Sequence, residues 1–366
     1  MARSNLGRNP DGQIKSSQYH VRRPLQSNVM QKLVQLVALA VGAWWLLDDR
    51  DKKMPAVQAH FERFHDQIRL GEDDEKAKLR KKREVILDTL KKHLDVDVPK
   101  FETFHQGSYA MHTGTVPPNG DYDIDVGLIF DSTRTNYSDP ITLKVAVRDA
   151  LERNGRKVDI RRSCVTVHYS IDREPEYHVD LAIYVKRSDG FLDIAKGKEH
   201  SKAEHRFWEK SDPQGLTKAL CNRFKDAELR QYRRCIRYMK RWRDVQFKAG
   251  APLSIALTVA AYRWFKPHHQ TFDEAPRDLL ALRYWTKAML NQFTTIRTAE
   301  GPHQRLRVLL PVEPKVDLLE RMTKAQMLRF HSALTSLHNS LNDAYSRSTQ
   351  EECIRLLAEQ FGAELA

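Results

Sequence analysis

The chain has 366 residues, which excludes a single-motif peptide and is the length expected for two or three lobes that share a core. Hydrophobic residues make up 41% of the chain and charged residues of both signs 30%, so a disordered or fibrous protein is also excluded. With 61 Lys and Arg against 48 Asp and Glu the formal net charge is +13, and we expect an anionic partner such as a nucleotide, a nucleic acid or a lipid headgroup.

The first fifty or so residues differ from the rest of the chain. Residues 1–28 are polar, basic and without periodicity, as in a disordered tail. Residues 33–47 then form an apolar run interrupted by Gln35, which is shorter than the roughly 20 residues of a membrane span. Three interpretations stay open: a helix packed on the protein or on a partner, a short membrane anchor, or upstream sequence before a true start at Met54.

Beyond this region the spacing of apolar residues predicts the elements in chain order. A long amphipathic helix begins at Met54, with Gly71 as a candidate break. Strands are expected at 122–130, 164–168 and 177–185, and helices at 141–154, 216–247, 252–265, 276–297, 316–344 and 349–361. The sequence therefore predicts an α+β protein with three parts, which are a basic tail with an apolar segment (1–53), a sheet lobe with an N-terminal helix (54–213) and a helical lobe (214–366).

The four cysteines are too widely spaced for a disulfide framework or for a zinc site of the CxxC type. We therefore expect reduced and mostly buried thiols in a cytoplasmic protein.

The clearest chemical signal is a pair of aspartates, Asp123 and Asp125, in one predicted strand. They lie two residues apart, so their side chains leave the same face with Cα atoms about 6–7 Å apart. Both carboxylates can reach one divalent cation or bridge a pair of cations, which is the arrangement that serves phosphoryl transfer. Asp180 stands in an otherwise apolar strand, where an unpaired charge is costly, and a bound metal would offset that cost.

A Gly-Ser pair, Gly107 and Ser108, precedes the acidic strand. The glycine lets the backbone approach a ligand, and the serine offers a hydroxyl and an amide to the phosphates of a nucleoside triphosphate. Taken alone, Gly-Ser carries little weight, and an Asp-x-Asp pair is more often a solvated face or a turn. Together with the lone aspartate further along the chain, however, the pattern resembles the DNA polymerase beta-like nucleotidyltransferases.

Four segments narrow this resemblance to the bacterial CD-NTases, which are similar to animal cyclic GMP-AMP synthase and make cyclic oligonucleotide signals in CBASS anti-phage defence. The segments are Gln106-Gly-Ser-Tyr109, Asp123-Ile-Asp-Val-Gly127, Tyr177-His-Val-Asp-Leu-Ala-Ile-Tyr184 and the helix Arg233–Asp244. The similarity extends from about Met54 to the C-terminus. It implies a polymerase beta-like sheet lobe, a C-terminal helical lobe and an active site in the cleft between them.

The resemblance also assigns roles to residues. It implies that Asp123, Asp125 and Asp180 are the catalytic residues and that they bind two Mg²⁺ or Mn²⁺ ions. It implies that nucleotide is bound by Gln106, Gly107, Ser108, Lys240 and Ser254. The residues alone also allow Lys240 to be one more solvated cation of an arginine-rich helix and Ser254 to be a helix N-cap, and they leave Asp121 and His178 outside the site.

The implied function is the synthesis of a cyclic di- or trinucleotide from NTPs, ATP among them, with release of pyrophosphate. The alternatives are a template-independent nucleotidyltransferase acting on RNA or protein, and an inactive nucleotide sensor. The implied partners are a CBASS regulator or a conjugation partner, and membrane contact through residues 33–47 stays open. The zinc ribbon that helps the animal enzyme to bind DNA has no counterpart in this sequence, so activation by nucleic acid is unsupported.

Overall fold

The computed structural model describes residues 57–366 except 72–74, 119, 121, 154, 170–176, 271–274 and 300. These residues lie in one compact unit, Pro55–Ala366. The apolar run at 33–47, the start at Met54 and Asp121 fall outside the described residues, so the interpretations given to them stay predictions. Among the described helices, none has both the length and the apolar character that crossing a bilayer requires.

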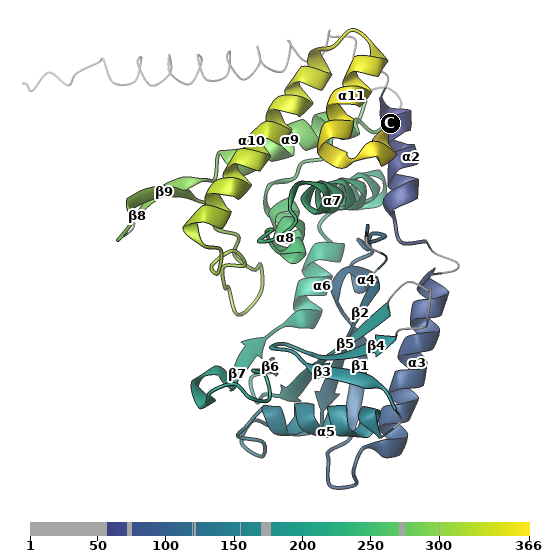
Figure 1. Cartoon of the computed structure of the whole chain (residues 1–366), viewed down its shortest axis with the longest axis vertical. Coiled ribbons are helices and arrows are strands. Elements are labelled where there is room, and N and C mark those ends of the chain that lie inside the picture. Colours follow the sequence, from purple (N-terminus) through teal and green to yellow (C-terminus); the bar gives the residue numbers. More distant parts are fainter. Residues whose placement is uncertain are drawn as a thin grey trace, which may run out of the picture. The chain divides into compact units, whose positions relative to one another are not determined.

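A mixed sheet forms the first half of the unit (Figure 1). Its strands are β1 (Phe101–His105), β2 (Tyr122–Phe130), β3 (Lys157–Ile160), β4 (Val165–Tyr169), β5 (Tyr177–Lys186), β6 (Leu192–Lys196) and β7 (Phe207–Ser211). The order is β1-β2-β5-β4-β3, and β6 pairs with both β5 and β7. Only the β2–β5 pair is parallel among the strand pairs of the described sheet.

Helices and one hairpin make up the rest of the described chain. The helices are α2 (Gln58–Ile68), α3 (Glu75–His93), α4 (Gly107–Ala110), α5 (Ile141–Glu152), α6 (Pro213–Cys221), α7 (Asp226–Gln246), α8 (Ser254–Trp264), α9 (Asp278–Leu290), α10 (Lys324–Ser346) and α11 (Gln350–Phe361), with short 3₁₀ turns η1 (Ala203–His205) and η2 (Ala363–Leu365). The hairpin consists of β8 (Thr294–Thr298) and β9 (Gly301–Arg305).

The α+β class is confirmed, as are the strands expected at 122–130 and 177–185. Three helix predictions were wrong in extent. The helix expected at 216–247 is interrupted after Cys221, and the helix expected at 276–297 ends at Leu290 and is followed by a strand. The helix expected at 316–344 begins at Lys324, where Thr323 and Gln326 form a capping box.

One face of the sheet is apolar because strand side chains alternate between faces. In β2 the residues Ile124, Val126, Leu128 and Phe130 enter a core together with the matching positions of β4 and β5. This core also contains Leu79, Ile86 and Leu90 of α3 and Leu143, Val147 and Leu151 of α5, so the two helices cover this face (Figure 1). The opposite face is therefore the one that carries the odd-numbered residues of β2.

A buried lysine, Lys144, ties α5 to the edge of the sheet. Its side chain has no exposure, and its Nζ donates to the carbonyls of Arg161, Arg162 and Gly197, each at 2.9 Å. Burial lowers the pKa of Lys144 to about 8, and the three acceptors compensate for the desolvation of its ammonium group.

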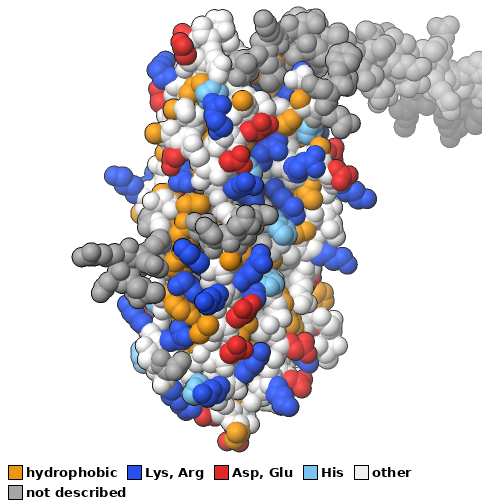
Figure 2. All heavy atoms as spheres, turned by 90° about the vertical axis from the view of Figure 1, so that its right-hand side faces the viewer, with side chains coloured by type: hydrophobic (Ala, Val, Ile, Leu, Met, Phe, Trp, Pro, Cys, Tyr) orange, Lys and Arg blue, Asp and Glu red, His pale blue; other side chains and the backbone are white. Residues whose placement is uncertain are grey.

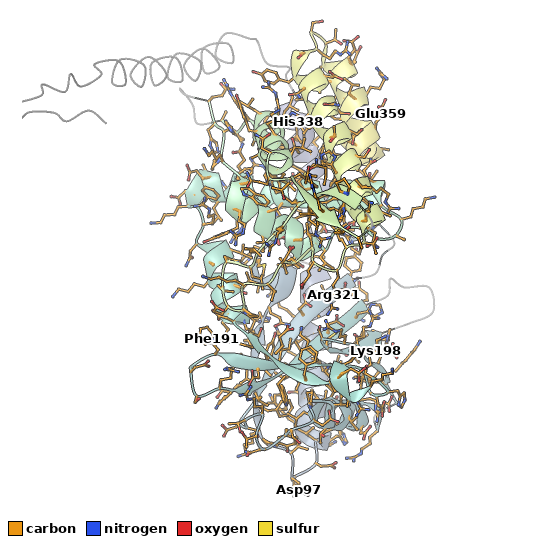
Figure 3. All side chains as sticks on the ribbon, turned by 90° about the vertical axis from the view of Figure 1, so that its left-hand side faces the viewer. Asp97, Phe191, Lys198, Arg321, His338 and Glu359 are labelled. Atoms are coloured by element: carbon orange, nitrogen blue, oxygen red, sulfur yellow. The ribbon has the colours of Figure 1, made fainter. Side chains whose placement is uncertain are left out.

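The long N-terminal helix of the sequence prediction is two helices that pack in different places. The second, α3, packs on α5 and β5, whereas α2 packs on α7, α9 and η2. Phe61 and Phe64 of α2 contact the rings of Tyr238 and Phe361 at centroid distances of 5.2–6.3 Å. Helix α2, at the start of the described chain, therefore belongs to the core of the helical half. Figure 3 shows this half, with His338 on α10 and Glu359 on α11 labelled.

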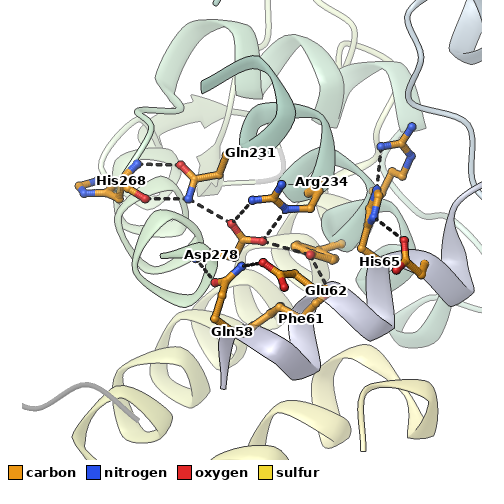
Figure 4. Close-up of polar contacts among 11 residues, drawn as sticks. Gln58, Phe61, Glu62, His65, Gln231, Arg234, His268 and Asp278 are labelled. Carbon is orange, nitrogen blue, oxygen red and sulfur yellow. Dashed lines mark hydrogen bonds and ion pairs between the residues drawn. The ribbon is translucent and has the colours of Figure 1, made fainter. Parts of the chain in front are cut away.

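A fully buried aspartate, Asp278, joins three helices of this half (Figure 4). Its carboxylate accepts from Arg234 (2.8 and 3.0 Å), Gln231 (3.0 Å) and Tyr238 (3.1 Å) of α7. Its backbone N–H donates to the side chain of Gln58 at the start of α2. Breaking a buried, fully hydrogen-bonded ion pair leaves the other charge uncompensated, so the carboxylate links α9 to α7. The backbone N–H of the same residue links α9 to α2.

We expect Asp278→Asn to lower the free energy of unfolding by about 3 kcal/mol, because Arg234 would stay buried without its anion. Urea unfolding followed by circular dichroism measures this. Asp88→Asn is the control: Asp88 is exposed and lies 3.6 Å from Lys91, and loss of such a surface pair costs less than about 1 kcal/mol. Equal losses in the two variants would contradict the role given to Asp278.

Candidate active site

Asp123, Asp125 and Asp180 lie on the sheet face opposite α3 and α5. Asp125 is directly opposite Asp180 in the parallel β2–β5 pair, and Asp123 is opposite His178. The hydroxyl of Thr166 on β4 donates to Asp180 at 2.6 Å, which fixes that carboxylate from the far side. The structure thus brings Asp125 and Asp180 side by side. Asp123 lies two residues before Asp125 in β2, and its side chain is 64% exposed.

Asp125 is held in an unfavourable electrostatic position. Burial and the charges of Asp180 and Asp123 raise its pKa to about 7, while Lys240 acts in the opposite direction. Neighbouring carboxylates that repel one another are stabilised by a cation placed between them. The donor set, two adjacent carboxylates with a third within reach, therefore suits a hard divalent cation.

Within the described residues, no three His, Cys, Asp or Glu side chains already converge as a metal cluster. The side chain of Asp123 lies 3.5 Å from His178 and is 64% exposed. The assignment of metal binding to the three aspartates remains a prediction.

The Gln106–Ser108 turn lies directly against Asp125. Gly107 has a φ of +67°, and a Cβ at this position would lie 1.8 Å from Oδ2 of Asp125. Only glycine fits there, both for conformation and for space. The side chain of Gln106 accepts a hydrogen bond from the buried Tyr184 at 2.9 Å, so the turn is anchored to β5. Gln106 is the N-cap of the short helix α4, and Ser108 is its second residue.

The segment that follows α4, residues 112–116, connects the turn to the helical half, and we call it the junction segment. Three α7 side chains donate to its carbonyls: Arg237 to His112 (2.7 Å) and Gly114 (3.0 Å), Lys240 to Thr113 (2.8 Å), and Arg241 to Val116 (3.1 Å). The backbone leaving α2 pairs with the same segment, with Leu70 donating to Gly114 and Val116 donating to Ile68. Helix α7 therefore sets where the turn lies.

Lys240 is not a solvated cation, because only 6% of it is exposed. Besides the carbonyl of Thr113 it contacts the hydroxyl of that residue at 3.3 Å. Burial lowers the pKa of Lys240 to about 7, while the charge of Asp125 raises it, which indicates that the two groups are close enough to interact. A phosphate contact by Lys240 stays a prediction.

Ser254 is the first residue of α8, and Leu253 is the N-cap, so the alternative of a Ser254 N-cap was wrong. No hydrogen bond described here joins its side chain to the acidic residues, and its role also stays a prediction. The sequence interpretation left out Arg237 and Arg241, although their i, i+3, i+4 spacing with Lys240 was the signal for one cationic face of a helix. It also left out Thr166, a polar residue in an apolar strand.

Further cations meet on the same side of the sheet. Arg162 and Lys196 have pKa values lowered mainly by burial, and the positive charge of Arg321 contributes to both shifts. Figure 3 shows Arg321, from the helical half, at the boundary with the sheet half. Lys196 is paired with Glu209 at 3.3 Å, which offsets part of this charge. An anionic substrate would be favoured here.

The outer face that bears α2 and α3 has a different distribution of charge. Figure 2 shows Lys and Arg side chains there interspersed with Asp and Glu. On α3 itself, exposed basic residues such as Lys81 and Lys91 alternate with the exposed Glu84 and Asp88. The described residues of this face therefore alternate in charge and do not form one continuous basic stripe of the kind that tracks a nucleic-acid backbone.

We expect Gly107→Ala to lower the free energy of unfolding by about 1–3 kcal/mol more than Gly190→Ala, because its Cβ would displace the Asp125 carboxylate. Gly190 is a matched control: its φ is +79°, and nothing lies within 4 Å of an added Cβ. Both variants share the backbone strain, so thermal unfolding of the pair isolates the contact with Asp125. Equal melting temperatures would show that the turn can move away freely.

A second prediction concerns His65 of α2, which accepts from Arg237 at 3.1 Å. Burial and the charges of Arg237 and Arg234 lower the pKa of His65 from 6.5 to about 4, although Asp66 opposes the shift. The unfolded chain therefore binds more protons between pH 6.5 and pH 4, and stability falls as the pH is lowered through this range. The loss is at most about 3 kcal/mol.

His65→Gln keeps an acceptor for Arg237 but does not titrate. We expect urea unfolding at pH 7 and pH 4.5 to show a smaller loss of stability in this variant than in the parent chain. An identical difference between the two pH values in both proteins would mean that His65 does not contribute.

Two family models match the chain. The nucleotidyltransferase domain of the DncV-like cyclic GMP-AMP synthases matches residues 99–184, and the C-terminal domain of cyclic GMP-AMP synthase matches residues 229–366, which is together more than half of the chain. No curated protein sequence matches it.

Several solved structures share the fold. The Bradyrhizobium diazoefficiens CD-NTase CdnG in complex with GTP has a TM-score of 0.65 at 17% identity, and the match covers 85% of this chain and 96% of that chain. A mutant of the Vibrio cholerae di-nucleotide cyclase DncV has a TM-score of 0.62 at 19% identity (84% and 96% covered). DncV in complex with the linear intermediate 5′ pppA(3′,5′)pG has a TM-score of 0.57 at 19% identity (84% and 97% covered). The chain therefore belongs to the DncV-like CD-NTase family and is a nucleotidyltransferase with the polymerase beta-like fold.

Proposed function

We propose that the protein joins nucleoside triphosphates, ATP among them, into a cyclic di- or trinucleotide that acts as a signal in anti-phage (CBASS) defence. The observation that carries the reaction is the pairing of Asp125 with Asp180 directly over Gly107. This puts the acidic residues beside the turn that begins α4. A triphosphate bound at the turn would have its reacting phosphorus next to the carboxylates.

In this proposal the residues of the chain bind and orient the substrates. Ser108 contacts the phosphates of the donor nucleotide with its amide and hydroxyl, and Gln106 and Gly107 allow the backbone to approach them. Lys240 and Ser254 contribute from the helical half. The buried ammonium group of Lys240 places positive charge near the leaving pyrophosphate, which is an electrostatic stabilisation that needs no reorganisation during the reaction.

Asp123, Asp125 and Asp180 would hold two Mg²⁺ or Mn²⁺ ions, with Asp180 on the side of the acceptor hydroxyl. When bound, the ions neutralise phosphate charge and lower the pKa of the attacking hydroxyl. Thr166 keeps the Asp180 carboxylate oriented through the 2.6 Å hydrogen bond. Ring closure requires the linear product to bind again with its other end at the carboxylates.

A regulator or a conjugation partner would complete such a signalling system. The C-terminal residues are packed in the structure: Leu365 is 1% exposed, and Glu364 pairs with Arg241 at 3.5 Å. Attachment through the C-terminus would therefore use the exposed Ala366 or require η2 to detach from the helical half.

The proposal is tested by incubating the protein with labelled NTPs and Mg²⁺, with and without RNA. A small product that resists phosphatase and has the mass of a cyclic oligonucleotide is expected. Extension of the RNA would replace this proposal with a tailing activity, and an absence of pyrophosphate release under all conditions would favour an inactive sensor.

We further expect Asp123→Asn with Asp125→Asn to reduce synthesis by about a thousandfold or more, because the carboxylates that bind and orient the reacting groups are lost. The melting temperature in EDTA should be equal or higher, because the variant removes a buried charge and the carboxylate repulsion, which together raise the pKa of Asp125. Asp131→Asn is the control, since Asp131 follows the same strand and pairs with Lys186 in solvent. A large fall in melting temperature would mean that the two aspartates hold the fold instead.

A further inference from the structure

Three side chains cross the catalytic face next to Asp123, and we call them the histidine string: His178 on β5, His168 on β4 and Asp159 on β3. His178 is directly opposite Asp123 on one side and His168 on the other. Nδ1 of His178 lies 3.5 Å from Oδ1 of Asp123. The two histidine rings meet edge to face, with centroids 4.6 Å apart and an interplanar angle of 84°.

The outer end of the string is fixed by a hydrogen bond. Nε2 of His168 lies 2.8 Å from Oδ2 of Asp159, which sets the orientation of the His168 ring. That ring lies against His178, which is 7% exposed and stands on β5, between β2 and β4 in the sheet. The imidazole that faces Asp123 is therefore confined by packing and by a strand paired on both sides.

Asp123 differs from Asp125 and Asp180 in the contacts that restrict its side chain. Asp125 lies against Gly107 and Asp180 accepts from Thr166, whereas the side chain of Asp123 is 64% exposed. A side chain in solvent loses rotamer freedom when it has to adopt one geometry. A fixed imidazole beside it reduces that loss, in the way that partners of ligating groups orient them.

We propose that His178, held in place by His168 and Asp159, is a positioning residue that orients the Asp123 carboxylate toward a divalent cation and the substrate phosphates. The inference rests on the proposed function of Asp123. It assigns a role to a histidine that the sequence interpretation left outside the site.

The role of the histidine string is tested with Mn²⁺ as the probe. Binding of Mn²⁺ to the full chain is measured by electron paramagnetic resonance, and kcat and KM for NTP are measured separately. We expect His178→Ala to weaken Mn²⁺ binding by about 10- to 100-fold and to lower kcat with less change in KM. His178→Asn should restore most of both, because its side-chain N–H₂ can occupy the position of Nδ1. Unchanged Mn²⁺ affinity in His178→Ala would overturn the inference.

Two further variants separate positioning from folding. His303→Ala removes another buried histidine, 8% exposed, from the β8–β9 hairpin, and should leave Mn²⁺ affinity unchanged. Asp159→Ala removes an exposed group, so the chain stays folded, and loosens His168; we expect it to weaken Mn²⁺ binding by about two- to fivefold. If His178→Ala unfolds, the Mn²⁺ affinity of Asp159→Ala decides whether the inference holds. An affinity equal to that of the parent chain would overturn it.

Asp123→Asn distinguishes the inference from the function on which it rests. If this variant loses Mn²⁺ affinity and synthesis while His178→Ala behaves as the parent chain, the histidine string is wrong and the proposed function stands. If Asp123→Asn retains both, the role of Asp123 is wrong, and the inference fails with it.

Discussion

The arrangement of the catalytic face depends on the hydrogen bonds between the cations of α7 and the carbonyls of the junction segment. Arg237, Lys240 and Arg241 are largely desolvated, and each offsets that cost by donating to the backbone. The segment they hold continues directly from the turn, and Gly107 of the turn rests on Asp125. A shift of α7 would therefore be transmitted through the backbone of the junction segment and of the turn to a carboxylate of the sheet.

Among the described residues, the buried charges of Asp278 and Lys144 are balanced by hydrogen bonds, whereas the charge of Asp125 is not balanced in this way. Asp278 has four hydrogen bonds to its carboxylate, and Lys144 has three carbonyl acceptors. Asp125 instead faces two other acids, and Lys240, whose charge acts on Asp125, already donates to Thr113. An unfavourable arrangement of charges of this kind persists where it serves function and where the surrounding structure holds the groups in place.

The sequence predicted what depends on local pattern. Asp123 and Asp125 are two residues apart in the strand, which placed both side chains on one face. The apolar residues that alternate with them identified the face that enters the core. The pairing of β2 with β5 could not be predicted, because the register that places Asp125 beside Asp180 is set between residues 55 positions apart. The β8–β9 hairpin was missed because Thr294–Thr298 follows the helical pattern of α9. The contacts of α2 with α7, α9 and η2 could not be predicted, because an amphipathic pattern indicates that a helix has a buried face but does not identify its partner.

The position of α2 has a consequence for how the chain folds during synthesis. The sheet half together with α3, residues 75–211, is contiguous in sequence and can form its core as soon as it leaves the ribosome. Helix α2 is made first but completes its contacts last, because Gln58 pairs with Asp278, 220 residues later, and His60 contacts Gln350, 290 residues later. Such long loops are costly to close and slow to form. A nascent chain would thus have a folded sheet, with its acidic face already assembled, before the helix that begins the described chain has a place to pack.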